Sequence, residues 1–212
     1  MMNDTNQKIG TLIQIFTRAP VEGEVKTRLI PELGARGSCE LHKRMSLHIL
    51  NVATKVSPAI EIWSTPDIDH PFFTSLDSNP ALKVQVGESL AERMASSLIH
   101  GLKKHKKVVL IGCDCPIIDE EILLRAFSLL DNHEYVFIPV EDGGFSLIGS
   151  VSFSSSIFQK VTWGSNLVMR QVRHNLKKNH YSWAELPTLW DVDQFADFKR
   201  LNQQMPSVTT DL

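Results

Sequence analysis

The chain has 212 residues, of which 42% are hydrophobic and 22% are charged, and its formal net charge is -2. This length suits one α/β domain with a buried sheet, so we expect a single domain over residues 1–212. The charge balance gives no basic footprint for nucleic acid, and no apolar run is long enough to cross a membrane. Residues 1–8 are polar and lack the apolar core of a signal peptide, which favours a cytoplasmic protein.

The three cysteines give no sign of a disulfide framework or a zinc site. Cys113 and Cys115 flank a single aspartate, and Cys39 stands alone. We therefore expect all three to be reduced side chains that serve mainly in packing.

The first half of the chain alternates apolar runs with helical periodicity. Residues 10–17 predict a buried parallel strand. Apolar residues then recur at steps of three or four over residues 36–56, which predicts a helix packed on a sheet. Shorter apolar runs at residues 59–63 and 82–86 predict two more strands.

The second half continues the alternation. Ser89 begins a helix that ends in the basic residues 103–107, interpreted as a solvated turn. The later elements are predicted, in chain order, as a strand at 108–111, a helix at 119–130, strands at 135–140 and 145–148, a helix at 166–178, a strand at 183–186 and a helix at 194–202. Residues 1–8 and 204–212 are expected to be flexible tails. Such alternation predicts a mostly parallel, doubly wound sheet that binds ligands at the carboxyl ends of its strands.

A loop with two cations follows the first predicted strand. It spans residues 19–29 and contains Lys26 and Arg28. Such a loop offers backbone N–H groups, an ammonium and a guanidinium to phosphate oxygens. It is not a Walker A motif, because Val25 and Pro20 stand where that motif has glycines. A polar surface loop is the alternative interpretation.

The strand at 108–111 delivers one carboxylate, Asp114, to its end, and Pro116 stops the strand directly afterwards. A carboxylate there would be costly to bury without a cation or N–H donors. Mg²⁺ prefers oxygen ligands and often binds through one or two carboxylates together with substrate phosphates. The alternative is that Asp114 caps a turn through Ile117.

Two later motifs add further carboxylates. The run Asp142-Gly143-Gly144 suits a tight turn, so a hairpin explains it at least as well as a substrate contact. Asp191 and Asp193 are separated by one residue and project to the same side if this segment is extended. Asp193 could instead be the N-cap of the last helix.

Together these segments resemble the nucleotide-diphospho-sugar transferase superfamily. They are most similar to a bacterial GT-A-like family, the arsenosugar-biosynthesis or selenodomain-associated glycosyltransferases. The similarity spans residues 10–197 and is carried, in the family's order, by residues 18–29, 91–94, 112–116, 142–145 and 191–194. It implies a three-layer α/β/α sandwich with a mostly parallel mixed sheet. Arg18, Ala91, Phe145 and Gly164 stand where the family usually has Lys, Gly, Tyr and Ser.

The resemblance also implies roles for single residues. Lys26, Asp114 and Asp142 are expected to act in catalysis, and Asp114 and Asp193 are expected to bind Mg²⁺ or Mn²⁺. The residues expected to bind the nucleotide or its phosphates are Ala19, Pro20, Gly23, Lys26, Thr27, Arg28, Glu92 and Arg93. The residues expected at the acceptor or the sugar are Asp142, Gly143, Gly144 and Trp163.

Glycosyl transfer from a nucleotide sugar to a small acceptor is the function that the resemblance favours. The string at residues 25–29 is also similar to a Lys-x-Arg-Leu segment of phospholactate guanylyltransferases and molybdenum-cofactor nucleotidyltransferases. Transfer of a nucleotide from a triphosphate to a phosphorylated small molecule, with release of pyrophosphate, is therefore the second hypothesis. A nucleotide-binding module without catalysis is the third. Several acidic groups around an anionic ligand argue against it, because they need a metal to join them.

Overall fold

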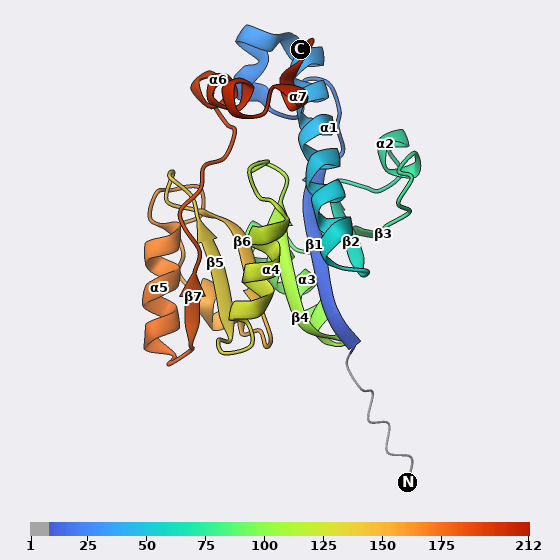
Figure 1. The fold of residues 1–212 in the computed structure, drawn as a ribbon. Helices are drawn as coiled ribbons and strands as arrows, with labels where there is room; N and C mark the ends of the chain where they lie inside the picture. The colour runs from blue at the N-terminus through green and yellow to red at the C-terminus, as the bar shows by residue number, and fades with distance from the viewer. Residues whose placement is uncertain (1–8) are drawn as a thin grey trace.

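A mixed sheet of seven strands runs through the residues that the computed structural model describes, 9–212 (Figure 1). The strands are β1 (Ile9–Arg18), β2 (Ile60–Thr65), β3 (Ala81–Val84), β4 (His105–Gly112), β5 (Tyr135–Pro139), β6 (Phe145–Ser150) and β7 (Trp183–Glu185). Their order across the sheet is β3-β2-β1-β4-β6-β5-β7. Strand β6 is antiparallel to both of its neighbours, and the other pairs are parallel. The prediction of a mostly parallel mixed sheet is confirmed.

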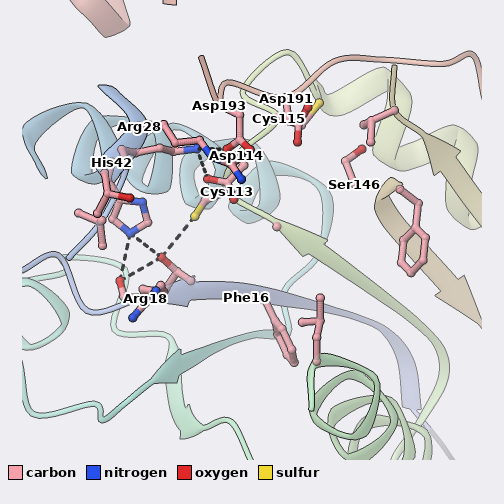
Figure 2. Close-up of a pocket in the computed structure, with 18 of the residues that line it drawn as sticks. Phe16, Arg18, Arg28, His42, Cys113, Asp114, Cys115, Ser146, Asp191 and Asp193 are labelled. Carbon is pink, nitrogen blue, oxygen red and sulfur yellow. Dashed lines mark hydrogen bonds and ion pairs between the residues drawn. The ribbon is translucent and has the colours of Figure 1, made fainter. Parts of the chain in front are cut away.

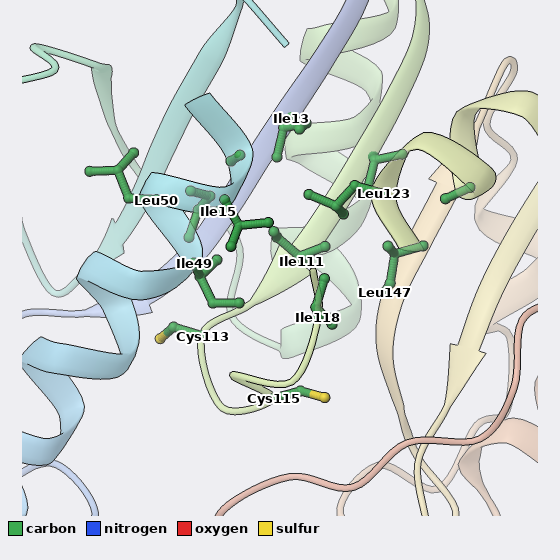
Figure 3. Close-up of a cluster of buried hydrophobic side chains, with 14 of the residues drawn as sticks. Ile13, Ile15, Ile49, Leu50, Ile111, Cys113, Cys115, Ile118, Leu123 and Leu147 are labelled. Atoms are coloured by element: carbon green, nitrogen blue, oxygen red, sulfur yellow. The ribbon is translucent and has the colours of Figure 1, made fainter. Parts of the chain in front are cut away.

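Helices cover both faces of the sheet, because its central strands bury side chains in both directions. The helices are α1 (Ile30–Val56) and α4 (Glu120–Leu129) on one face, and α3 (Leu90–Leu102) and α5 (Val168–Lys178) on the other (Figure 1). Ile13 of β1 packs in the same cluster as Ile49 of α1 (Figure 3), whereas its neighbour Leu12 packs in the cluster of Leu98 of α3. Successive side chains of a strand point to opposite faces, so both clusters share one apolar run. The predicted three-layer sandwich is confirmed.

A third apolar cluster joins α1 to the C-terminal helices α6 (Phe195–Gln204) and α7 (Pro206–Thr209). Leu41 of α1 is buried in it together with Trp190 and Val208. In Figure 1, α6 and α7 lie beside the first turns of α1, at the end of the sheet to which β1 points. The short elements outside the layers are η1 (Thr27–Leu29), α2 (Pro71–Thr74) and η2 (Ser155–Phe158).

Three local predictions differ from the structure. Helix α1 begins at Ile30 and not at residue 36, and a non-helical Gly34 (φ 71) kinks it. Residues 105–107 belong to β4 and do not form a solvated turn; Lys107 reaches Asp131 with its ammonium at 2.7 Å, which lets a lysine lie in an interior strand.

The expected flexible tail at 204–212 instead contains α7, which is held by the burial of Val208 and Thr209. The other expected tail, residues 1–8, lies outside the described residues. Within residues 9–212, no helix is both long and apolar enough to cross a membrane.

Candidate active site

The carboxyl ends of β1 and β4 line a cavity at the point where the strand order reverses. From β1 the chain continues to β2 on one side, while β4 lies on the other side. Ligands of doubly wound sheets bind at such a switch point, because the neighbouring loops diverge there. The cavity has a volume of about 510 Å³, and its walls are the loop 24–28, the ends of β1 and β4, the start of α3, and residues 191 and 193 (Figure 2).

Lys26 extends its side chain into the carboxylates of this cavity. Its Nζ lies 2.5 Å from Asp114 Oδ1 and 3.8 Å from Asp193 Oδ1, and it donates to the carbonyl oxygen of Val192 at 2.6 Å. Burial alone would lower the pKa of Lys26, but the Asp114 carboxylate holds it above its ordinary value, so the ammonium stays charged. The Lys26 backbone is left-handed (φ 47), which is uncommon outside glycine, and these contacts hold it in place.

Asp114 follows β4, as the sequence predicts. Burial alone would raise its pKa, yet the Lys26 ammonium holds the pKa of Asp114 below its ordinary value. The side chain is nevertheless 53% exposed, so its carboxylate remains accessible from the cavity. Its backbone carbonyl accepts a hydrogen bond from the N–H of Val192 at 2.8 Å. This bond fixes the segment before α6 to the end of β4.

Arg28 and Asp193 form the second ion pair of the cavity. Arg28 donates to Asp193 Oδ2 at 2.6 Å, and the arginine side chain is 64% exposed. Asp193 is not the N-cap of the last helix, because Gln194 is the N-cap and the Asp197 carboxylate accepts from the N–H of Asp193 and Gln194. Lys26, Arg28, Asp114 and Asp193, which come from three motifs and are predicted to bind phosphate and metal, therefore meet in one cluster, although their roles stay predictions.

Asp191 lies beside this cluster and makes it more acidic. Burial, followed by repulsion from Asp142, Asp193 and Asp114, raises the pKa of Asp191 to about 6. The local charge is thus negative in spite of the two paired cations. Mg²⁺ and Mn²⁺ favour oxygen ligands, and this edge of the sheet offers three carboxylates and the Val192 carbonyl. The chemistry of these oxygen donors suits a divalent cation.

His42 of α1 contacts the end of β1 and was not predicted. Its Nε2 donates to the carbonyl oxygen of Arg18 at 3.1 Å and lies 3.2 Å from Thr17 Oγ1, which accepts from the Cys113 thiol at 3.3 Å (Figure 2). Burial lowers the pKa of His42, so we assign it as a neutral positioning group. A sequence signal was present, because His42 precedes Met45 by three residues on the buried face of α1.

An apolar wall forms the other half of the cavity and was also missed. Its residues are Phe16, Leu90, Met94, Leu110 and Phe145. Leu90 is 49% exposed, which is unusual for a leucine at the start of a helix that packs on the sheet. The sequence showed Phe16, Leu90 and Leu110 only as parts of a strand or of an amphipathic helix, a pattern that does not separate cavity lining from core. Met94 and Phe145 lie in segments that carry the family resemblance, but they were not predicted as cavity residues.

Several predicted site residues have local structural partners and do not line this cavity. Glu92 accepts from the N–H groups of Glu88 and Ser89 as part of a capping box, and Arg93 donates to the carbonyl oxygen of Gly87. Trp163 packs edge-on against Phe145 and Phe158.

The Asp142-Gly143-Gly144 turn is explained by its own geometry. One Asp142 oxygen accepts from the N–H of Gly144 at 2.8 Å. Gly143 has φ 90, and a Cβ there would lie 2.2 Å from the Asn166 carbonyl oxygen. Residues 142–144 do not line the cavity themselves, but Val140, Phe145 and Ser146 on either side of the turn do.

The other predicted phosphate-binding residues of the loop 19–29, here called the phosphate loop, include one that lines the cavity and three that do not. Thr27 lines the cavity with Lys26 and Arg28. Ala19 and Pro20 are buried, and the N–H of Ala19 donates to the carbonyl oxygen of Thr65 at 3.0 Å. Gly23 is exposed, with φ 84, at the tip of the loop. Backbone geometry accounts for these three positions.

Comparisons with known proteins agree with the fold. A crystal structure of a "putative nucleotide-diphospho-sugar transferase" from Desulfovibrio desulfuricans G20 is 26% identical, with a TM-score of 0.87 over 95% of this chain and 93% of that chain. The 4-diphosphocytidyl-2C-methyl-D-erythritol synthase from Anaerococcus prevotii is 12% identical, with a TM-score of 0.59 over 93% of this chain and 96% of that chain. A Mycobacterium tuberculosis protein in complex with manganese is 16% identical, with a TM-score of 0.54 over 94% of this chain and 100% of that chain.

The expected likeness to nucleotide-diphospho-sugar transferases is thereby confirmed. No curated protein matches the chain. Residues 48–165, more than half of the chain, match the family described as "Uncharacterized protein conserved in bacteria (DUF2064)", and the protein belongs to this family.

Proposed function

We propose that this protein transfers a glycosyl group from a nucleotide-sugar donor to a small acceptor with the help of Mg²⁺ or Mn²⁺. One observation carries the proposal: two cations from the loop after β1 meet two carboxylates from the edge of β4 and from the segment before α6, inside one cavity. Opposite charges in that arrangement suit a diphosphate and the divalent cation that accompanies it.

Each charged side chain has a role in this proposal. Asp114 and Asp193 hold the divalent ion, which when bound would act as a Lewis acid toward the diphosphate oxygens. Lys26 and Arg28 bind the same diphosphate and stabilise the negative charge that develops on it as it leaves. The acceptor hydroxyl oxygen bonds to the anomeric carbon, the bond from that carbon to the diphosphate oxygen breaks, and the hydroxyl proton is released to solvent.

The uncharged part of the donor would lie along the apolar wall. Phe16, Leu90 and Met94 offer no charge to a ligand, and Phe16 lies across the site from Arg28 and Asp114 (Figure 2). A cavity of about 510 Å³ is in the range of small-molecule sites. In this proposal the acceptor arrives from the side of the turn at residues 142–144 and of Trp163. Trp163 packs against Phe145, which follows the turn and lines the cavity.

Nucleotidyl transfer is the second candidate, and Arg18 is the observation that favours it. This exposed arginine also lines the cavity, on a different side from Arg28 (Figure 2). A triphosphate carries more charge than a nucleotide sugar, and a third cation would suit it.

A thermal-shift panel tests the proposal. We expect nucleoside diphosphates and nucleotide sugars to raise the melting temperature in the presence of Mn²⁺, and to do so far less after Asp114→Asn. The matched control is Asp119→Asn, because Asp119 caps α4 and asparagine is an equally good cap. No shift with any nucleotide, with or without Mn²⁺, would contradict the proposal.

A further inference from the structure

The surroundings of the Lys26 ammonium are those of a bound cation. Its three neighbours are oxygens: Asp114 Oδ1 at 2.5 Å, the Val192 carbonyl at 2.6 Å and Asp193 Oδ1 at 3.8 Å. The lysine side chain is 5% exposed, so it reaches this position from inside the protein and not from solvent. Two carboxylates and a backbone carbonyl are also what a hard divalent ion prefers.

Both cations of the phosphate loop are occupied in this arrangement. Lys26 is paired with Asp114, and Arg28 is paired with Asp193. The two positive and two negative charges cancel, and Asp191 beside them adds a negative charge, so the cluster without a metal does not attract a diphosphate. A divalent ion shared by the same carboxylates would free both cations for phosphate oxygens and would make the cluster positive.

We propose that Lys26 is an internal counter-cation that competes with the divalent ion for Asp114 and Asp193, and that it becomes available to phosphate only when the ion takes its place. This inference rests on the proposed function and concerns how the same site is regulated. Metal and nucleotide then bind with positive coupling, because each favours the state in which Lys26 has left the carboxylates.

The competition predicts that removal of Lys26 raises the affinity of the site for a metal ion, which the other roles of a lysine do not predict. A lysine that serves only to bind phosphate would not affect metal binding in the absence of nucleotide. A lysine in a structural ion pair away from the metal ligands, such as Lys55 with Glu120, would leave the metal affinity unchanged when removed. A competing lysine raises the affinity for the metal alone when it is removed, although nucleotide binding becomes weaker.

Calorimetric titration of MnCl₂ into the full chain without nucleotide tests the inference. We expect Lys26→Met to bind Mn²⁺ about tenfold more tightly than the wild type, which lies within the usual range of coupling between sites. Lys26→Gln is the second variant, since it keeps a hydrogen-bond donor for Val192 and guards against misfolding. Lys55→Met removes the same charge from an exposed pair with Glu120 at the far end of α1 and is expected to match the wild type.

The outcomes separate this inference from the proposed function. Equal or weaker Mn²⁺ binding by folded Lys26→Met and Lys26→Gln, with binding that Asp114→Asn abolishes, would overturn the competition and leave the metal site standing. Absence of Mn²⁺ binding in every variant, with or without a nucleoside diphosphate, would overturn the metal-dependent function and the inference together. Tighter binding in both Lys26 variants but not in Lys55→Met would support the inference.

Discussion

At the scale of single residues, the chemistry of the site lies in one ion-pair cluster. Lys26 holds the pKa of Asp114 below its ordinary value, so this carboxylate is charged at neutral pH although its surroundings are partly apolar. Asp191 has no such cation, and burial together with its acidic neighbours raises its pKa to about 6. The cluster thus keeps Asp114 ionised, so that it can bind a cation, and Asp191 adds a second negative charge beside it.

Removal of the Asp114 charge is expected to remove activity without unfolding the protein. Asp114→Asn keeps the shape of the side chain, which is half exposed, but loses the charge that would hold a divalent ion. By analogy with the loss of one group that stabilises transition-state charge, turnover should fall by about 10²–10³-fold. Steady-state kinetics and a thermal melt measure the two effects; unchanged turnover would remove Asp114 from the mechanism.

The Arg28 side chain is expected to contribute to phosphate binding. Because it is 64% exposed, water screens its charge, so Arg28→Ala should weaken binding of a nucleoside diphosphate by about tenfold, near the lower end for a charged hydrogen bond. Arg36→Ala, an exposed arginine that does not line the cavity, is the control. Equal affinities of both variants in a calorimetric titration would exclude a role for Arg28.

The sequence predicted some site residues and missed others for physical reasons. Lys26, Arg28 and Asp114 follow strands, and the carboxyl ends of parallel strands gather at one edge, so motif position alone located them. His42 was missed because its role depends on the packing of α1 against the end of β1. The role of Glu92 at the nucleotide stays a prediction, and in this structure its carboxylate completes the capping box of α3.

At the scale of elements, periodicity predicted the helices and strands that face the core. The boundaries of α1 and β4 were displaced, because Gly34 interrupts the helical backbone and Lys107 finds a partner in Asp131 beyond the strand. Helix α7 has only four residues and no cap, so its order comes from tertiary burial of Val208, which no local pattern reveals.

Val208→Ala is expected to lower the free energy of unfolding by about 1–2 kcal/mol, because it leaves a small cavity in the cluster that holds α6 and α7 against α1. Val86→Ala is the control, since that side chain is 62% exposed. Urea denaturation followed by circular dichroism gives both values. Equal midpoints of the two variants would show that α7 does not stabilise the fold.

The Arg173–Glu185 pair joins α5 to β7 and gives a pH-dependent prediction. Arg173 donates twice to the Glu185 carboxylate, at 2.8 and 2.7 Å, and these bonds hold the pKa of Glu185 below its ordinary value. A lowered folded-state pKa stabilises the protein above the unfolded pKa, and this contribution is lost as the pH falls through the folded pKa.

Glu185→Gln should therefore lower the free energy of unfolding by about 0.5–1 kcal/mol at pH 7, a small value because water reaches the arginine. The difference from the wild type should shrink as the pH falls below about 4.3, the ordinary glutamate pKa. Denaturation curves at several pH values measure it, and a difference that grows on acidification would contradict this sign.

At the scale of the whole molecule, topology brings distant parts of the chain into one site. Lys26 and Asp193 lie far apart in sequence, yet the segment before α6 crosses to the end of β4, where the Val192 N–H donates to the Asp114 carbonyl. The third apolar cluster holds that segment in place through Trp190 and Val192. The site therefore depends on the C-terminal helices as much as on the loop that carries its cations.

The leaving group tests the central claim most directly, because the fold and the ion-pair cluster suit both kinds of transfer. The measurement is a pair of coupled assays for nucleoside diphosphate and for pyrophosphate, run with Mn²⁺ over a panel of nucleotide sugars and nucleoside triphosphates, with water as the default acceptor. Glycosyl transfer predicts that a nucleotide sugar releases its nucleoside diphosphate and that Asp114→Asn abolishes this release. The contrary result is release of pyrophosphate from a nucleoside triphosphate when a phosphorylated acceptor is present, with this release lost in Asp114→Asn. That result would contradict the account and make the protein a nucleotidyltransferase.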